Sequence, residues 1–454
     1  MIECFPFAGY PVAVLGLGEE GRAAARALHL SEAEVSAWDS DRARRDGAME
    51  DEIPVADLSG ADWREFVSLV IEASVPHGTD PHPYVRAALD AGSEVISDAE
   101  LLVRSQRLAE YVGVTGADGA EFTCQLIHYL LTLSGKEAEM GGFPLSPLMD
   151  LHPLYGGTYV LYMPPDKLDI TVSITFDTAC WIGPDGSGNG EDGLERQALI
   201  FHRQTDPRTA VVCVDDDGGR ALFDRLAGVG DQIVVPVSGA GAVAGGIFIE
   251  SGVLYDDGKG ERVPVLPFAG LAAYDHRRDR TLAAVAYAAA LSRGVEPPAA
   301  MASLRSFPGV EGLRAPLERV DGVLFIDDTA SSTVADVERS LAGYDGPVVW
   351  IGGGDEPFGD DIADALAATA GPAVIVGRSA ETLGEGPRVE TALRKGNARI
   401  FFFPILSSGL WPNRGLAVKS RVRPCGRTLP FPGLRPGLEL VGSAPAPGPR
   451  SESA

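Results

Sequence analysis

The clearest chemical pattern in this chain of 454 residues is a glycine loop that reads Gly-Val-Thr-Gly-Ala-Asp-Gly-Ala-Glu-Phe-Thr and ends at Thr123. In a phosphate-binding loop, backbone N–H groups and a helix N-terminus hold the anion, a Lys neutralises the β- and γ-phosphates, and a Ser or Thr binds Mg²⁺. Gly116 and Gly119 are the glycines of such a loop, but Ala120 and Glu121 occupy the positions of the Lys and the hydroxyl residue. The loop therefore has the glycines of a nucleotide site without its cation and its metal ligand.

The acids of this loop support a second interpretation. Asp118 and Glu121 stand three residues apart at the start of an apolar helix, which is the spacing of a capping box. The helix N-terminus would then be satisfied internally, and an incoming phosphate would meet two carboxylates. Loss of the Lys alone removes about 1.5 to 3 kcal/mol of charge-assisted hydrogen bonding. We therefore expect ATP affinity or turnover to be lower by orders of magnitude.

A second glycine motif lies near the N-terminus. Gly16, Gly18 and Gly21 form a Gly-x-Gly-x-x-Gly pattern between a predicted strand and a predicted helix, and Asp39 ends the next predicted strand. In this context backbone amides meet a diphosphate and the acid meets a ribose hydroxyl. The alternative is a tight strand-to-helix turn that binds nothing. This motif is also the single feature of the sequence that would support an NAD(P)-dependent oxidoreductase.

Other candidate residues occur near the ends of predicted elements. Asp327 and Asp328 end a strand and are expected either to hold a metal or a substrate amine, or to cap a helix. Cys124 and His128 stand four residues apart on one helix, but two ligands fall short of a zinc site, so core packing is favoured. His276 precedes an Ala-rich helix as a solvated or capping residue.

The elements that must position these residues follow from the hydrophobic pattern. Short apolar runs alternate with helical stretches, which is typical of parallel α/β units whose ligands bind at the carboxyl ends of the strands. The predicted β-rich segments are residues 11–18, 34–41, 68–74, 93–98, 111–116, 159–163, 169–175, 209–216, 231–237, 245–255, 261–268, 317–330, 347–356 and 372–377. The predicted helices are residues 21–30, 82–92, 99–110, 121–135, 279–294, 334–344 and 361–371, and residues 183–193 form a Gly- and Asp-rich loop.

The composition narrows the class of partner. The net charge is −26, which argues against a nucleic-acid surface because that surface would need a basic footprint. No run of about 18 apolar residues is free of charges, Gly and Pro, and the chain does not start with a basic signal-peptide segment. We therefore expect no membrane partner and a cytoplasmic location. Five scattered cysteines favour free buried thiols over disulfides or a zinc site.

The chain is expected to contain three domains, at residues 1–105, 106–303 and 304–395, followed by an aberrant tail at 396–454. The tail is basic, with eight Lys or Arg against two Asp or Glu, and it holds nine prolines between Pro404 and Pro449. A shifted reading frame near residue 395 would explain both the change of charge and the loss of periodicity. Resequencing that finds an intact frame would exclude this hypothesis.

Taken in order, these motifs resemble the Mur ligase family, and most of all its D-glutamate-adding branch, from residue 12 to about residue 395. The matching segments are residues 14–28, 91–102, 113–123, 195–201, 304–333 and 348–356. The resemblance implies an α/β fold of three domains: a Rossmann-like domain that binds the UDP precursor, a central P-loop-type ATP domain, and a Rossmann-like domain that brings the amino acid. It implies ATP and Mg²⁺ as cofactors, a UDP-N-acetylmuramoyl-type nucleotide sugar and D-glutamate as partners, and a monomer.

The resemblance also implies a reaction and its residues. In this family a carboxylate is activated as an acyl phosphate, which an amine attacks with release of ADP and phosphate. The resemblance implies catalytic roles for His276 and Asp328. It also aligns residues 177–182 with a polar, metal-binding stretch of the family, and of those polar residues this chain retains only Asp177. The implied cleft of the C-terminal domain contains Asp327, Thr329, Thr333, Gly353 and Asp355.

The departures from the family occur where its chemistry is expected. Family lysines correspond to Ala120, Gln197, Ala330 and Glu356, and Gln cannot be carbamylated as the family's Mg²⁺-bridging Lys is. The first expectation is therefore an impaired homologue of peptidoglycan precursor synthesis that still binds a nucleotide sugar. The second is an active ligase in which Lys136 or an arginine supplies the missing charge. The third is a partner-binding or NAD(P)-binding protein.

Overall fold

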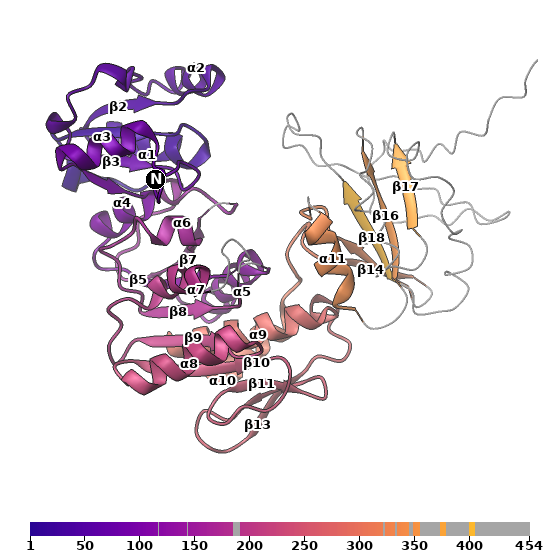
Figure 1. Cartoon of the computed structure of the whole chain (residues 1–454). Helices are drawn as coiled ribbons and strands as arrows, with labels where there is room; N and C mark the ends of the chain where they lie inside the picture. Colours follow the sequence, from indigo (N-terminus) through magenta and orange to yellow (C-terminus); the bar gives the residue numbers. More distant parts are fainter. Residues whose placement is uncertain are drawn as a thin grey trace, which may run out of the picture. The chain divides into compact units, whose positions relative to one another are not determined.

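The computed structural model describes residues 1–116, 118–142, 144–184, 191–320, 323–331, 334–344, 348–354, 373–377 and 399–404. The chain divides into two compact units, Met1–Val310 and Glu311–Ala454. The first unit contains two sheets and the second unit contains one (Figure 1). Among the described residues, no helix has the length and apolar character needed to cross a bilayer.

The first sheet consists of four parallel strands in the order β2-β1-β3-β4, and all four of the strands expected for this region are confirmed. The strands are β1 Pro11–Leu15, β2 Glu34–Trp38, β3 Ser68–Ile71 and β4 Glu94–Ile96. The accompanying helices are η1 Phe5–Phe7, α1 Glu19–Leu30, α2 Arg42–Glu50, η2 Leu58–Gly60, η3 Trp63–Glu65, α3 Pro83–Ala91 and α4 Asp98–Ser105. Because β1 lies between β2 and β3, residues that follow these three strands meet at one edge of the sheet.

The second sheet has nine strands in the order β13-β12-β11-β10-β9-β8-β5-β7-β6. Pairing is parallel from β11 to β6, and β12 and β13 add an antiparallel edge. The strands are β5 Glu110–Thr115, β6 Ala138–Gly141, β7 Thr158–Tyr162, β8 Thr178–Trp181, β9 Thr209–Cys213, β10 Ile233–Ser238, β11 Ile247–Glu250, β12 Val253–Asp256 and β13 Val263–Pro267. The helices are α5 Ala120–Leu133, η4 Leu148–Asp150, α6 Pro165–Leu168, α7 Glu191–Ala198, η5 Leu199–Phe201, α8 Asp217–Val229, η6 Ala272–Tyr274, α9 Arg277–Ser292 and α10 Pro297–Ser306.

One expected strand is wrong. Residues 169–175 are not a strand, and the strand at this point of the sheet is β8, which begins three residues later. An apolar residue of this segment packs elsewhere, because Ile170 is buried in a core cluster with residues of the first sheet. The Ile170 carbonyl accepts a hydrogen bond from the Ser97 N–H at 3.2 Å, and the Ser97 and Thr171 hydroxyls lie 2.6 Å apart. Tertiary contacts therefore override the local strand pattern.

A buried ion-pair cluster also joins the first sheet to the second. Lys167 of α6 is 2% exposed, pairs with Glu20 of α1, and lies 2.9 Å from Asp98 of α4. A buried ammonium needs such partners because desolvation of an unpaired charge is expensive. One large hydrophobic cluster contains residues of both sheets, from Ile2 to Leu222. The two sheets of the first unit therefore share a core.

The second unit contains a five-stranded sheet in the order β14-β15-β18-β16-β17, with β14 antiparallel to β15 and the other pairs parallel. The elements are β14 Ala315–Val320, β15 Val323–Asp327, α11 Val334–Ala342, β16 Val348–Gly354, β17 Ala373–Gly377 and β18 Arg399–Pro404. The predicted helix at 361–371 lies outside the described residues. Strand β18 follows residue 395, where we expected periodicity to end. The reading-frame hypothesis stays a prediction.

Candidate functional site

The phosphate-type loop of the second sheet lies between β5 and α5. Gly116 has φ 129° and Gly119 has φ 95°, backbone angles that favour glycine. A Cβ on Gly116 would lie 2.6 Å from the Ile182 side chain, and a Cβ on Gly119 would lie 2.1 Å from the Leu282 side chain. Both glycines are therefore required by backbone angle and by close packing, so the loop keeps its shape without the family's charged residues.

The capping-box interpretation of this loop is wrong. The N-cap of α5 is Gly119, one residue later than the box requires, and no side chain caps the helix from that position. Glu121 is therefore the second helical residue, and its carboxylate accepts a hydrogen bond from Gln125 Nε2 at 3.2 Å. Burial raises the pKa of Glu121, and the bond from Gln125 opposes this. The buried Thr123 hydroxyl donates to the Gly119 carbonyl at 2.8 Å.

Among the described residues, Arg278 in the first turn of α9 is a cation that contacts the loop. Its guanidinium donates from Nη2 to the Asp118 carbonyl at 2.9 Å and to the Ile182 carbonyl at 2.7 Å, and from Nε to the Asp118 carbonyl at 3.2 Å. Our expectation named an arginine in general, and no motif singled out this one. The other candidate, Lys136, follows the opposite end of α5, and a helix of 14 residues spans roughly 20 Å. Lys136 is therefore not the cation at this loop.

Two positions implied by the family resemblance are engaged in local structure. His276 is 2% exposed and is the N-cap of α9, where its Nδ1 accepts a hydrogen bond from the Arg278 N–H at 3.2 Å. It is thus a capping residue but not a solvated one. Gln197, at a position where the resemblance implies a Lys, is 1% exposed, and its Oε1 accepts a hydrogen bond from Trp181 Nε1 at 3.0 Å.

Asp177 lies at the other edge of the second sheet. It precedes β8, and its carboxylate accepts a hydrogen bond from the N–H of Tyr111 at the start of β5, at 2.8 Å. The loop containing Gly116 follows the opposite end of β5. The structure therefore does not bring Asp177 to the loop, and its position does not fit a metal ligand there.

The Cys124 and His128 pair also takes part in packing. Cys124 is fully buried, and burial raises the pKa of its thiol well above its ordinary value. His128 Nε2 hydrogen-bonds the Ala138 carbonyl at 3.2 Å. These contacts support the core-packing interpretation over a shared metal.

The N-terminal glycine motif forms the expected tight turn between β1 and α1. Gly16 has φ 92°, and a Cβ on Gly21 would lie 1.9 Å from the Gly16 carbonyl oxygen. Asp39 accepts hydrogen bonds from the Leu17 and Asp41 N–H groups, both at 2.8 Å. Burial acts to raise the pKa of Asp39, but these bonds and Arg44 lower it overall. Asp39 thus stays ionised beside the turn.

Glu72 belongs to this site, although sequence reasoning missed it. It directly follows β3, is 8% exposed, and its Oε1 accepts a hydrogen bond from the Gly21 N–H at 3.0 Å. Arg44 Nη1 lies 3.3 Å from Asp39 Oδ2 and 3.9 Å from Glu72 Oε2. The one signal in the sequence that could have identified Glu72 was its position, as a carboxylate directly after the strand that pairs with β1.

The acids of the second unit stabilise the turn after β15. Asp328 is fully buried and accepts hydrogen bonds from the Arg314 N–H at 2.9 Å and the Ser331 hydroxyl at 3.0 Å. Burial raises the pKa of Asp328, and its hydrogen-bond donors oppose this. Asp327 accepts from the Thr329 N–H at 3.1 Å. Both carboxylates therefore stabilise this turn, and the two expected roles, capping a helix or holding a metal or a substrate amine, stay predictions.

The remaining cleft residues of the second unit are only partly described. Gly353 lies in β16, at the carboxyl end of a parallel strand. Thr333, Asp355 and Glu356 lie outside the described residues. The proposed cleft therefore stays a prediction.

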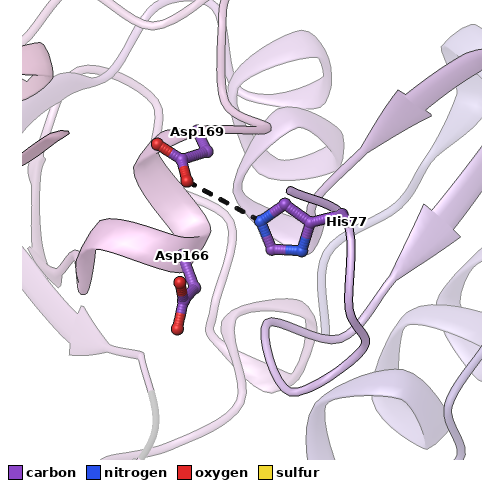
Figure 2. A group of neighbouring side chains, drawn as sticks. All are labelled: His77, Asp166 and Asp169. Carbon is purple, nitrogen blue, oxygen red and sulfur yellow. Dashed lines mark ion pairs between the residues drawn. The ribbon is translucent and has the colours of Figure 1, made fainter. Parts of the chain in front are cut away.

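A further group that could attract a metal consists of His77, Asp166 and Asp169 (Figure 2). His77 Nδ1 donates to the Val75 carbonyl at 2.8 Å, while Nε2 faces Asp169 at 3.9 Å. Arg196 already pairs with both carboxylates, and its Nε lies 2.9 Å from Asp169 Oδ2. The group is therefore part of an ion-pair network in which one guanidinium offsets part of the charge of the two carboxylates.

Comparison with solved structures defines the class of protein. No family model matches the chain. MurF from Acinetobacter baumannii is similar, with a TM-score of 0.53 and 16% identity, covering 86% of this chain and 90% of that one. UDP-N-acetylmuramate-alanine ligase MurC from Thermotoga maritima has a TM-score of 0.52 and 15% identity, covering 87% and 96%. The fold is that of the three-domain α/β Mur ligases.

Curated relatives define the family more narrowly. The UDP-N-acetylmuramoylalanine--D-glutamate ligase of Caulobacter sp. (strain K31) is 32% identical over 409 residues, covering 85% of each chain. The protein of the same name from Chelativorans sp. (strain BNC1) is 30% identical, covering 97% of this chain and 99% of that one. The chain belongs to the UDP-N-acetylmuramoylalanine--D-glutamate ligase family.

Proposed function

We propose that this chain is a family member in which ATP-driven amide ligation is impaired and which retains binding of a UDP-N-acetylmuramoyl-type nucleotide sugar. The observation that carries the proposal is the start of α5. Ala120 is 3% exposed where the family has its Lys, and the half-buried Glu121 carboxylate follows it. A carboxylate in poorly solvated surroundings repels the β- and γ-phosphates of Mg·ATP more strongly than it would in water.

Other changed residues support the same conclusion. Gln197 is buried and bonded to Trp181, and an amide of this kind cannot be carbamylated to hold Mg²⁺. Asp177 faces the other edge of the sheet. Ala330, in the turn after β15, has no charge to offer a substrate carboxylate. The residues present therefore do not fit Mg·ATP as the family binds it.

The test measures ATP binding and turnover directly. Calorimetric titration with Mg·ATP should show no tight binding, and no ADP should be released with UDP-N-acetylmuramoyl-L-alanine and D-glutamate. The double variant Ala120→Lys with Glu121→Thr should bind Mg·ATP more tightly than the unmodified chain. Leu133→Lys combined with Glu137→Thr is the matched control, because it makes the same change of +2 in charge at exposed residues near the far end of α5. Tight Mg·ATP binding by the unmodified chain would contradict the proposal, as would D-glutamate-dependent ADP release.

A second candidate function is an active ligase in which Arg278 replaces the loop Lys. The position of its guanidinium beside the Asp118 carbonyl favours this alternative. A phosphate would have to compete with the two backbone carbonyls that Arg278 already bonds. If this alternative holds, Arg278→Ala should abolish ADP release, while Arg305→Ala, at an exposed arginine of α10, should not.

The partners proposed for the chain follow from its family. The nucleotide sugar would bind through Gly16, Gly18, Gly21 and Asp39 of the first sheet, and D-glutamate would bind in the second unit, with the chain acting as a monomer. A binding screen of UDP-sugars against ATP tests the nucleotide preference. Preference for ATP would contradict this part of the proposal, and sedimentation of the full chain tests the oligomeric state.

A further inference from the structure

The glycine loop after β1 already holds a carboxylate. Glu72 Oε1 accepts the hydrogen bond of the Gly21 N–H at 3.0 Å, so one amide of the motif is occupied from within the chain. A Cβ on Gly16 would lie 2.8 Å from a Glu72 oxygen, and a Cβ on Gly18 would lie 2.6 Å from one. The space left open by the missing glycine side chains is therefore filled by the Glu72 carboxylate.

The charges around Glu72 make this loop unfavourable for a second anion. Asp39 faces it from the end of β2, Glu20 from the first turn of α1, and Arg44 of α2 lies near both Glu72 and Asp39. Lys167 pairs with Glu20 rather than with Glu72. Three carboxylates thus surround the turn, and Arg44 is the cation that Glu72 and Asp39 share. A diphosphate would add negative charge to a buried site that is already acidic.

We propose that Glu72 is a specificity-determining residue that acts as an internal ligand of this loop, so that a nucleoside diphosphate binds only when the Glu72 carboxylate leaves Gly21. The inference rests on the proposed function, because it takes this loop as the nucleotide-sugar site. Glu72 opposes the diphosphate in two ways. It occupies the same N–H group, and its charge repels the phosphates.

Two substitutions separate these effects. Glu72→Gln removes the charge but leaves an amide oxygen that can still accept from Gly21, and Glu72→Ala removes the side chain from the loop. Glu65→Gln and Glu65→Ala are matched controls, because Glu65 is exposed in the same domain. Gly18→Ala combined with Glu72→Ala puts a methyl group back into the emptied space. Thermal melting of each full-length variant checks that it is folded.

The experiment is calorimetric titration of the full chain with UDP and, separately, with inorganic pyrophosphate. UDP affinity should rise from the unmodified chain to Glu72→Gln to Glu72→Ala, with at least about a tenfold gain for the last, since like charges in a binding site repel each other. Added Gly18→Ala should cancel most of that gain. The Glu65 variants should match the unmodified chain.

The outcomes distinguish this inference from the proposed function. If the unmodified chain and Glu72→Ala bind UDP equally well, the loop is a nucleotide site but Glu72 does not control it, and only the inference fails. If no variant binds either UDP or pyrophosphate, the proposed nucleotide-sugar site fails and the inference with it. If pyrophosphate binding rises in Glu72→Ala while UDP binding stays absent, the loop takes a diphosphate without the nucleoside. That result supports the role of Glu72 and contradicts the nucleotide-sugar assignment.

Discussion

The two glycine loops of the first unit look alike in sequence and differ in what surrounds them. Each follows a parallel strand and precedes a helix, and each contains at least one glycine with positive φ. The loop after β1 receives the Glu72 carboxylate, whereas the loop after β5 is bordered by the Arg278 guanidinium. A glycine pattern therefore reports the backbone shape of a phosphate-type turn, and the side chains that reach it from other segments decide which charge it accepts.

The largest expected effect tests whether close packing holds the β1–α1 turn. Gly21→Ala puts a Cβ 1.9 Å from the Gly16 carbonyl oxygen, so the backbone must move. We expect a loss of about 3 kcal/mol in the free energy of unfolding, measured by denaturant titration. The control is Gly228→Ala, also in a helix but with open space around the new methyl group, which should be neutral or slightly stabilising. Equal stability of Gly21→Ala and the unmodified chain would show that the turn tolerates a side chain.

Arg278→Ala tests the other loop. The substitution removes hydrogen bonds to the Asp118 and Ile182 carbonyls, and we expect a loss of about 2 kcal/mol in stability. The free energies of unfolding of Arg278→Ala and of the control Arg305→Ala, which changes an exposed arginine, are compared by denaturant titration. A change no larger than that of the control would mean that Arg278 does not hold this loop in place.

Asp39→Asn weakens the polar support of the β1–α1 turn while leaving Glu72 in place. In Asp39 a different carboxylate oxygen accepts from each of the Leu17 and Asp41 N–H groups. Asn has one side-chain oxygen and no charge, so one of these hydrogen bonds is lost and the other no longer has a charged acceptor. We expect a loss of about 1.5 kcal/mol in the free energy of unfolding. Asp46→Asn, at an exposed ion pair on α2, should change stability by less than about 0.5 kcal/mol. Indistinguishable effects at the two positions would contradict a structural role for Asp39.

The smallest effect is a pH dependence. Burial raises the pKa of Glu72 above its ordinary value of 4.5; the Gly21 N–H and Arg44 oppose this, and Glu20 and Asp39 add to it. A carboxyl group with a raised folded-state pKa contributes stability below 4.5, and that contribution is lost as the pH rises through the folded-state value. The stability of the unmodified chain relative to Glu72→Gln should therefore fall as the pH rises through this window. Denaturant titration across the pH range measures this difference in the free energy of unfolding, with Glu65→Gln as the control. If the difference between the unmodified chain and Glu72→Gln does not change with pH, the raised pKa of Glu72 is contradicted.

Much of the fold was predictable because the hydrophobic pattern is local. The four strands of the first sheet and the helix after β5 follow from apolar runs that any parallel α/β unit needs. The expected strand at 169–175 was wrong because Ile170 packs against the other sheet, a contact that no local pattern encodes. The capping box was wrong for a smaller reason, since the helix begins one residue later than the spacing implied.

The candidate sites were predictable only in part. The glycines and Asp39 were identified from spacing, and the structure brings them together at one turn. Glu72 and Arg278 were missed because they come from 51 and 160 residues away along the chain. The polar residues Asp177 and Gln197 were noticed through resemblance, but their hydrogen bonds to Tyr111 and Trp181 commit them to local structure.

The sequence by itself determined the family, the two glycine turns and the absence of lysines from the four positions where the resemblance implies them, because these depend on which residues occur and in what order. Only the tertiary structure decided what occupies each turn. Strand order places β3 beside β1, so Glu72 reaches Gly21, and α9 begins beside the β5–α5 loop, so Arg278 reaches Asp118. The charge of a backbone anion site depends on such long-range neighbours, since electrostatic interactions follow distance in space and not separation along the chain.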